Sequence, residues 1–186
     1  DTARSRGLGD VYKRQIYRSI FILPYAIPAF VSVLVWKGIL NPDYGVVNAW
    51  LSPIYELLDV EPIRWFLTKD SSRAAVLLVN TWLGFPYMFL ITTGALQSIP
   101  KELTEAAKVD GATGIQSFWK ITLPLLMVSI SPLLIGAFAF NFNNFTLVFL
   151  LTGGGPPVVG SEVPLGWTDL LISVSYTHLT LPTIRE

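Results

Sequence analysis

Uncharged polar side chains recur inside long apolar stretches of this sequence. Asn80 and Tyr87 lie in one stretch with Gly84 between them, and Asn141 and Asn144 lie in another. Polar groups in such helices are costly unless they face a partner or a cavity. Amide and phenol groups donate and accept hydrogen bonds without carrying charge, which suits the hydroxyl groups of a neutral polyol. These residues therefore predict a path for a neutral solute, and the alternative is hydrogen bonding between helices, worth about 0.6 kcal/mol on average.

The spacing places these residues on shared helix faces. Asn80, Gly84 and Tyr87 follow the i, i+4, i+7 pattern of one α-helical face. Asn141 and Asn144 are related by i, i+3 on a second helix. No acidic or basic residue faces this proposed path, which argues against an ionic solute.

The sequence lacks the residues that most enzyme chemistry needs. The chain of 186 residues has no cysteine, and its one histidine, His178, lies in a polar tail. Disulfides, zinc–thiolate sites and thiol catalysis are therefore excluded. The sequence has neither a Gly-x4-Gly-Lys phosphate loop nor a Gly-x-Ser-x-Gly elbow. We expect no catalytic residue, no metal site and no cofactor.

The composition is that of a membrane protein. Hydrophobic residues make up 52% of the chain and charged residues only 14%, against about 25% charged in a typical soluble domain. The formal net charge is zero, so there is no electrostatic case for a nucleic-acid partner. We therefore expect membrane lipid to surround the chain.

Three apolar stretches are long enough to cross a bilayer, whose hydrocarbon core of about 30 Å needs about 20 helical residues. They are residues 19–40, 74–96 and about 121–143. Pro24 and Pro28 should kink the first span. The third continues as FTLVFLL into the turn signal GGGPP. The predicted fold is an all-α, polytopic membrane helix bundle.

The two linkers between the predicted spans lie on opposite sides of the membrane. Residues 41–73 are polar and contain Trp50 and Trp65, which suit headgroup depth. The linker 97–120 and the residues before the first span lie on the same side by parity. Arg18 precedes the first span, and Lys101, Lys108 and Lys120 lie in the second linker. Because lysine and arginine favour the cytoplasm, we place this side inside.

A short charged helix interrupts the apolar chain at about 98–120. Ser98 is the expected N-cap, and Gly111 is the expected stop because it has no Cβ. Isolated helices under about 12 residues are marginal, so something must hold this one. Its small side chains allow a close backbone approach, and its carboxylates are available to a partner's arginines. These are the properties of a docking helix.

The same residues resemble a known motif. Glu105-Ala106-Ala107, then Gly111 after three residues, then Ile121-x-Leu123-Pro124 resemble the EAA loop of ABC-importer permeases. The segments LPYAIPAF, VNTWLGFPYM and FAFNFNNF are similar to the larger permease subunit of the maltose/maltodextrin importers, over about residues 16–172.

The resemblance implies an architecture and a set of partners. The chain would be part of an ABC-importer transmembrane domain, at 16–174, in a bacterial inner membrane. The partners would be two ATPase subunits that hydrolyse ATP, a second permease subunit, a solute-binding protein and a carbohydrate. We expect further spans on both sides, and non-native ends at 1–15 and 175–186, because these ends resemble translated adaptor sequence.

The resemblance also implies two groups of site residues. The EAA helix would contact the ATPase subunit through Glu105, Ala106, Ala107, Asp110 and Gly111. The sugar site would be lined by Tyr25, Asn80, Gly84, Tyr87, Asn141 and Asn144. Ala29 and Ala137 replace serines of the family, so two hydroxyl contacts to the same sugar would be missing.

Two other functions compete with a maltodextrin importer. One is an importer of another neutral solute on the same fold. The other is a secondary transporter or a membrane scaffold without ATP coupling. A secondary transporter usually carries an acid or base within the membrane for ion coupling, and none is evident here. A scaffold would have no use for the EAA spacing.

Overall fold

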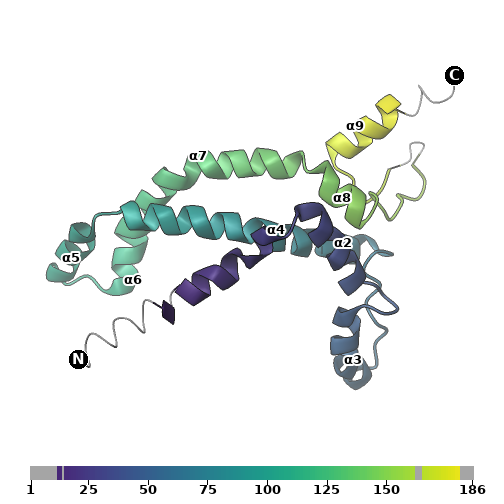
Figure 1. The fold of residues 1–186 in the computed structure, drawn as a ribbon, viewed down its shortest axis with the longest axis horizontal. Coiled ribbons are helices and arrows are strands. Elements are labelled where there is room, and N and C mark those ends of the chain that lie inside the picture. Colours follow the sequence, from purple (N-terminus) through teal and green to yellow (C-terminus); the bar gives the residue numbers. More distant parts are fainter. Residues whose placement is uncertain (1–11, 14, 162–164, 181–186) are drawn as a thin grey trace. The chain divides into compact units, whose positions relative to one another are not determined.

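The computed structural model describes residues 12–13, 15–161 and 165–180, and within these ranges its regular elements are helices (Figure 1). In chain order they are η1 Leu23–Ala26, α2 Ala29–Ile39, α3 Val46–Leu58, α4 Lys69–Ser98, α5 Lys101–Val109, α6 Gly114–Ser117, η2 Phe118–Thr122, α7 Leu123–Phe142, α8 Phe145–Leu151 and α9 Leu171–Thr180. The all-α prediction is confirmed. The predicted non-native ends fall largely outside the described residues, as does the side chain of His178.

The first predicted span is broken rather than merely kinked. Gln15–Ala26 and α2 meet at an angle of 92°. The break falls at Ile27, whose φ of −100° and ψ of 130° are extended. The residue before a proline is pushed out of the helical region, and Pro28 follows Ile27 directly. Pro24 lies at the start of η1, where its missing N–H costs little.

The other two predicted spans are confirmed, and both are longer than hydropathy indicated. α4 has 30 residues, and Gly114–Phe142 has 29. Each is long and apolar enough to cross a membrane. Hydropathy underestimates them because polar residues at their ends continue the helix without contributing apolar character.

The second of these helical stretches begins with a π-helical turn, η2. The N–H of Leu123 donates to the carbonyl of Phe118, five residues back. Pro124 follows, has no N–H, and in a regular α-helix its ring would crowd the carbonyl of Lys120. The wider turn relieves this crowding where the Ile-x-Leu-Pro pattern enters the membrane helix.

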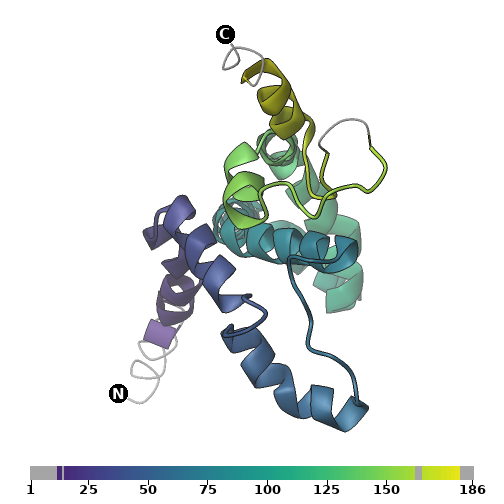
Figure 2. The same cartoon turned by 90° about the vertical axis from the view of Figure 1, so that its right-hand side faces the viewer.

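The linker 41–73 contains a helix that the sequence reading did not identify. α3 ends at Asp59, which adopts the left-handed conformation with φ 51°. The chain then returns as an extended segment to the start of α4 (Figure 2). Trp50 is exposed, but Trp65 is buried. Trp65 therefore packs against protein and does not face lipid, and its depth in the membrane stays a prediction.

A single asparagine joins α3 to this return segment. The Asn48 amide nitrogen donates to the carbonyls of Pro42 at 3.2 Å and Ile63 at 2.9 Å. Its oxygen accepts from the Tyr55 hydroxyl at 3.3 Å and from the Trp65 indole N–H at 3.0 Å. Asn48 is only 8% exposed. Its four hydrogen bonds satisfy the Tyr55 hydroxyl, the Trp65 indole N–H and two backbone carbonyls.

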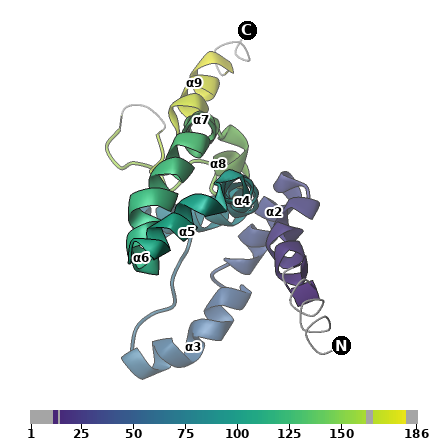
Figure 3. The same cartoon turned by 90° about the vertical axis from the view of Figure 1, so that its left-hand side faces the viewer.

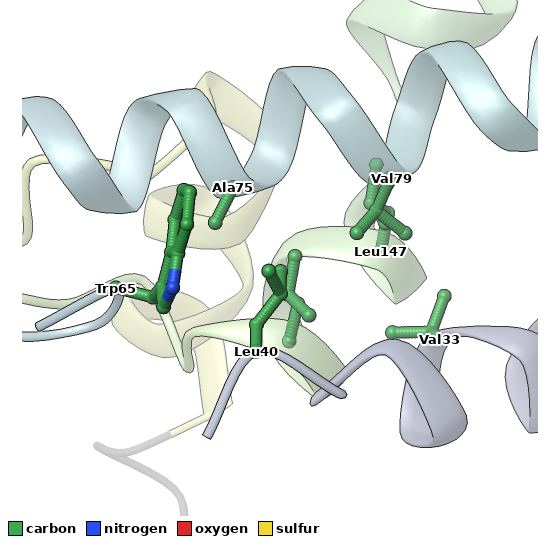
Figure 4. Close-up of a cluster of buried hydrophobic side chains, with 7 residues drawn as sticks. Val33, Leu40, Trp65, Ala75, Val79 and Leu147 are labelled. Atoms are coloured by element: carbon green, nitrogen blue, oxygen red, sulfur yellow. The ribbon is translucent and has the colours of Figure 1, made fainter. Parts of the chain in front are cut away.

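The chain forms two compact units, residues 1–84 with 142–186, and residues 85–141. The first has a hydrophobic core between α2, α4, α8 and the segment that leads into α4 (Figure 4). Its buried members are Val33, Leu40, Trp65, Ala75, Val79, Leu147 and Leu151. Fully burying one valine or leucine side chain contributes about 1.5–3 kcal/mol. This core therefore ties together segments that are distant in the sequence.

The predicted breaker GGGPP ends α8 and folds onto residues 165–169. Gly153 and Gly154 have positive φ angles of 63° and 85°. The Thr168 N–H donates to the Gly154 carbonyl at 3.0 Å. A Cβ at Gly154 would come within 2.3 Å of an Asp169 carboxylate oxygen. The positive φ therefore favours glycine at 154, and a side chain there would also displace the Asp169 carboxylate.

Candidate functional site

The predicted docking helix exists as α5, with a different start. Pro100 occupies its N-cap position, and no side chain caps it. The Ser98 hydroxyl instead donates to the Ala95 carbonyl at 2.8 Å within the last turn of α4. The N-cap prediction for Ser98 is therefore wrong. The residue before a proline disfavours helix, which separates α4 from α5 at this point.

The predicted stop at Gly111 is confirmed, with its physical cause. Gly111 has φ 81°, the left-handed conformation that glycine adopts without strain. Its N–H donates to Lys108 at 3.1 Å, and the Ala112 N–H donates to Ala107 at 2.9 Å. These two bonds form a Schellman motif, which satisfies carbonyls left open at the helix end.

The protein's own chain supplies part of the support that α5 needs. α5 contacts α6 and η2 (Figure 3), and Ala107 is only 8% exposed. α6 begins with a reciprocal cap, in which Thr113 Oγ1 accepts from the Gln116 N–H and Gln116 Oε1 accepts from the Thr113 N–H. The Thr-x-x-Gln spacing is a capping-box signature that the sequence reading missed.

The remaining motif residues of α5 face outward. Glu105, Ala106, Asp110 and Gly111 are exposed, whereas Ala107 lies inside. Two apolar residues that were not predicted as contacts, Val109 and Ile115, are 88% and 75% exposed. The sequence signal at Val109 is an apolar side chain between Lys108 and Asp110 at the end of a short helix. Carboxylates beside bare apolar side chains form a surface suited to binding a protein partner.

Asn80 and Gly84 are two of the predicted solute-lining residues on α4. The Asn80 side chain is half-buried and makes no hydrogen bond to the residues that the structure describes. A Cβ at Gly84 would meet no neighbouring atom within 4 Å. A hydrogen bond within the described residues therefore does not explain Asn80, and close packing does not explain Gly84.

Asn141 and Asn144 both have local hydrogen-bonding roles. The Asn144 side-chain oxygen accepts from the Leu147 N–H at 3.3 Å and caps the N-terminus of α8. The Asn141 amide donates to the Ala137 carbonyl at 2.7 Å, one turn back. These bonds leave the amide N–H₂ of Asn144 and the amide oxygen of Asn141 available to a ligand.

The six predicted solute-lining residues are divided between the two units. Tyr25, Asn80, Gly84 and Asn144 belong to residues 1–84 with 142–186, and Tyr87 and Asn141 to residues 85–141. Among the described residues, no hydrogen bond joins Tyr25, Asn80 and Asn144 to one another. Tyr25 is more than half exposed on η1, and Tyr87 is half-buried on α4. Their assembly into one site remains a prediction.

The described residues contain no group of three or more His, Cys, Asp or Glu that could hold a metal ion. The neutral polar groups along the apolar helices can form hydrogen bonds with a ligand. The surface around α5 offers charged and apolar side chains for contact with a protein.

The family model for the binding-protein-dependent transport system inner membrane component matches residues 10–180. The maltose/maltodextrin transport system permease protein MalF of Salmonella typhimurium is 49% identical over 163 residues, which are 88% of this chain and 31% of that protein. MalF of Vibrio vulnificus and of Escherichia coli K12 are 48% and 47% identical over the same length. The chain thus spans about a third of the length of these relatives.

Solved structures show the same fold. A bacterial ABC transporter that imports the acidic polysaccharide alginate matches with a TM-score of 0.74 and 26% identity, over 93% of this chain and 56% of that one. The alginate transporter in complex with an alginate pentasaccharide-bound periplasmic protein matches with a TM-score of 0.72. From the family match and these likenesses, the chain belongs to the binding-protein-dependent transport system inner membrane components, a family of multi-pass bacterial inner-membrane permeases.

Proposed function

We propose that this chain is part of the permease subunit of an ATP-driven carbohydrate importer and that maltodextrins are its solute. α5 carries the ATP coupling. It is a short helix between two membrane helices, its C-terminus is fixed by a Schellman motif, and it exposes Glu105, Ala106 and Asp110. Ala107 of the same helix is buried. ATP hydrolysis belongs to a separate subunit, which this surface contacts.

The partners follow from the family. Two ATPase subunits, a second permease subunit and a solute-binding protein complete the importer. One structural relative was solved with an alginate-bound periplasmic protein, which supports a binding protein as a partner. The basic residues beside α5 support a position on the cytoplasmic side, where the ATPase would lie.

A neutral sugar fits the membrane helices better than an acidic one. No charged residue occurs between residues 74 and 100 or between 121 and 161. An anionic polymer such as alginate would need basic groups along its path. The 47–49% identity to maltodextrin permeases supports the same choice. Ala29 and Ala137 in place of serines indicate that the sugar is held with fewer hydroxyl contacts.

The function is tested with the protein encoded by the longest reading frame containing this sequence, assembled with its partner subunits in vesicles. We expect uptake of labelled maltotriose that requires both ATP and the binding protein. Uptake without ATP would instead identify a secondary transporter. Uptake of alginate oligosaccharide but not of maltotriose would overturn the neutral-solute assignment.

The coupling role of α5 is tested by a matched pair of charge reversals. Glu105→Lys should abolish maltotriose uptake while membrane insertion stays normal. Glu102→Lys changes the same charge on the same helix outside the motif and should retain most uptake. Equal loss in both variants would show that net charge, not the motif position, decides the outcome.

Gly111 needs a subtler change because its φ is positive. Leucine or alanine there would strain the backbone by roughly 1–2 kcal/mol whether or not a partner approaches. Asparagine tolerates this conformation and still adds a side chain. We expect Gly111→Asn to keep α5 folded and to lose uptake because the side chain blocks a close approach of the ATPase. Normal uptake in Gly111→Asn would limit Gly111 to the role of a helix stop.

A further inference from the structure

One face of α3 is apolar and exposed. Its residues recur at helical spacing, and the two most exposed, Trp50 and Leu57, are 80% and 83% accessible. The full set is Val46, Trp50, Ile54, Leu57 and Leu58. Such a continuous apolar helix face on a protein surface marks an interaction site.

The rotation of α3 is fixed, so this exposure is a built feature. Asn48 and Tyr55 are buried on the other side of the helix and hydrogen-bond to each other. At 3.6 residues per turn, Asn48 lies about 160° around the helix from Trp50. The hydrogen bonds of Asn48 to the Ile63 carbonyl and the Trp65 indole hold this side of α3 against the return segment. The apolar face must therefore point away from it.

The position of α3 in the chain indicates what covers this face. α3 joins α2 to α4, and α4 is long and apolar enough to cross a membrane. The 13 residues of α3 rise only about 20 Å, too short for a hydrocarbon core of about 30 Å. The helix is thus near the bilayer and cannot cross it. Tryptophan on its apolar face is typical of the lipid–water interface.

The polar flank of α3 is acidic. Glu56, Asp59 and Glu61 line an open hollow of about 450 Å³ with Ser52 and Tyr55, on the flank away from Trp50. No lysine or arginine occurs between residues 41 and 63. The acidic groups belong in water, and attraction to anionic headgroups is absent. Association with lipid would therefore depend on the apolar face alone.

We propose that α3 lies flat in the lipid–water interface on the side of the membrane where α4 starts, with Trp50 and Leu57 among the acyl chains and the acidic flank in water. This inference rests on membrane insertion of α4 and not on which solute is carried. It is distinct from the contact of α5 with an ATPase.

The test uses single cysteines carrying nitroxide probes in the complete transporter, in vesicles of phosphatidylethanolamine and phosphatidylglycerol. The probe sites are Trp50→Cys and Leu57→Cys on the apolar face, with Ser52→Cys and Glu56→Cys as matched controls. The measurement compares probe collisions with oxygen, which dissolves in lipid, and with a water-soluble nickel chelate. We expect the oxygen-to-nickel collision ratio to be several-fold higher at 50 and 57 than at 52 and 56, at both low and high salt.

Two outcomes would overturn the proposal. High nickel accessibility at 50 and 57 would place the face in water. Low accessibility to both reagents would show that another subunit or the binding protein covers it. ATP-dependent uptake in the same vesicles reports on the importer separately, so normal uptake with a failed collision pattern would refute only this inference. Asn48→Ala should reduce the difference between the two faces, because the helix loses its fixed rotation.

Discussion

Asn48 and Asn80 are the same residue in two helices of one compact unit, with opposite environments. Asn48, in the outer linker, uses its amide in four hydrogen bonds and is buried. Asn80, in the middle of α4, makes no side-chain bond to the described residues and is half-buried. The Asn48 amide therefore stabilises the fold. The Asn80 amide has no hydrogen-bond partner among the described residues and is available to a ligand or another subunit. Substitutions should separate the two cases.

Asn48→Ala should have the largest effect on stability. It would leave the Trp65 indole N–H and two carbonyls without their partner, and each unsatisfied buried group costs about 1–3 kcal/mol. We expect the free energy of unfolding to fall by about 3 kcal/mol or more, measured by thermal unfolding of the purified protein. Asn41→Ala is the control, because Asn41 accepts two exposed hydrogen bonds, from the N–H groups of Asp43 and Tyr44. Equal losses in the two variants would contradict a central role for Asn48.

Asn80→Ala should lower the affinity for the solute and leave the stability unchanged. If Asn80 binds sugar, the change removes a hydrogen bond worth about 0.5–1.5 kcal/mol, a several-fold to tenfold loss of affinity. The measurement is the concentration dependence of maltotriose uptake at matched protein level, with thermal unfolding in parallel. Lower stability with unchanged concentration dependence would make Asn80 a contact between helices or subunits.

The contrast between these asparagines also shows what could be read from the sequence. The membrane helices follow from apolar length, and the end of α5 follows from Gly111, because both signals are local. The hub at Asn48 has partners 6 to 17 residues away. No periodicity indicates such partners, so the burial of Trp65 could not be predicted. α3 itself was missed although its apolar residues recur at helical spacing. The cap formed by Thr113 and Gln116 could have been predicted, because its Thr-x-x-Gln spacing is local in the sequence.

The candidate site divides in the same way. The outward face of α5 was predictable because a single short helix carries it, although only the structure shows that Ala107 turns inward. The solute-lining set draws on η1, α4, α7 and the start of α8. The identities of Asn80 and Asn144 looked equivalent in the sequence. Only the fold reveals that one amide is open and the other caps a helix.

Asn144 lies between these two extremes, and two substitutions can separate its roles. Asn144→Ala loses the cap of α8 and should cost about 1 kcal/mol of stability. Asn144→Ser keeps an acceptor oxygen and should restore that stability, but it also lacks the amide N–H₂. We expect uptake to fall in both variants at matched protein level. Normal uptake in Asn144→Ser would assign Asn144 to the cap alone.

Gly84→Ala should have the smallest effect, and it tests the open side of α4 most directly. A methyl group there meets no neighbouring atom within 4 Å. Alanine is favoured over glycine in helix interiors by about 0.8–1.0 kcal/mol, so stability should stay equal or rise slightly. If Gly84 lines the solute path, the added methyl group should nevertheless slow maltotriose uptake. Gly94→Ala is the matched control, since Gly94 is on the same helix and is equally open. Slower uptake in both variants would indicate contact with another subunit, and normal uptake in both would remove Gly84 from the path.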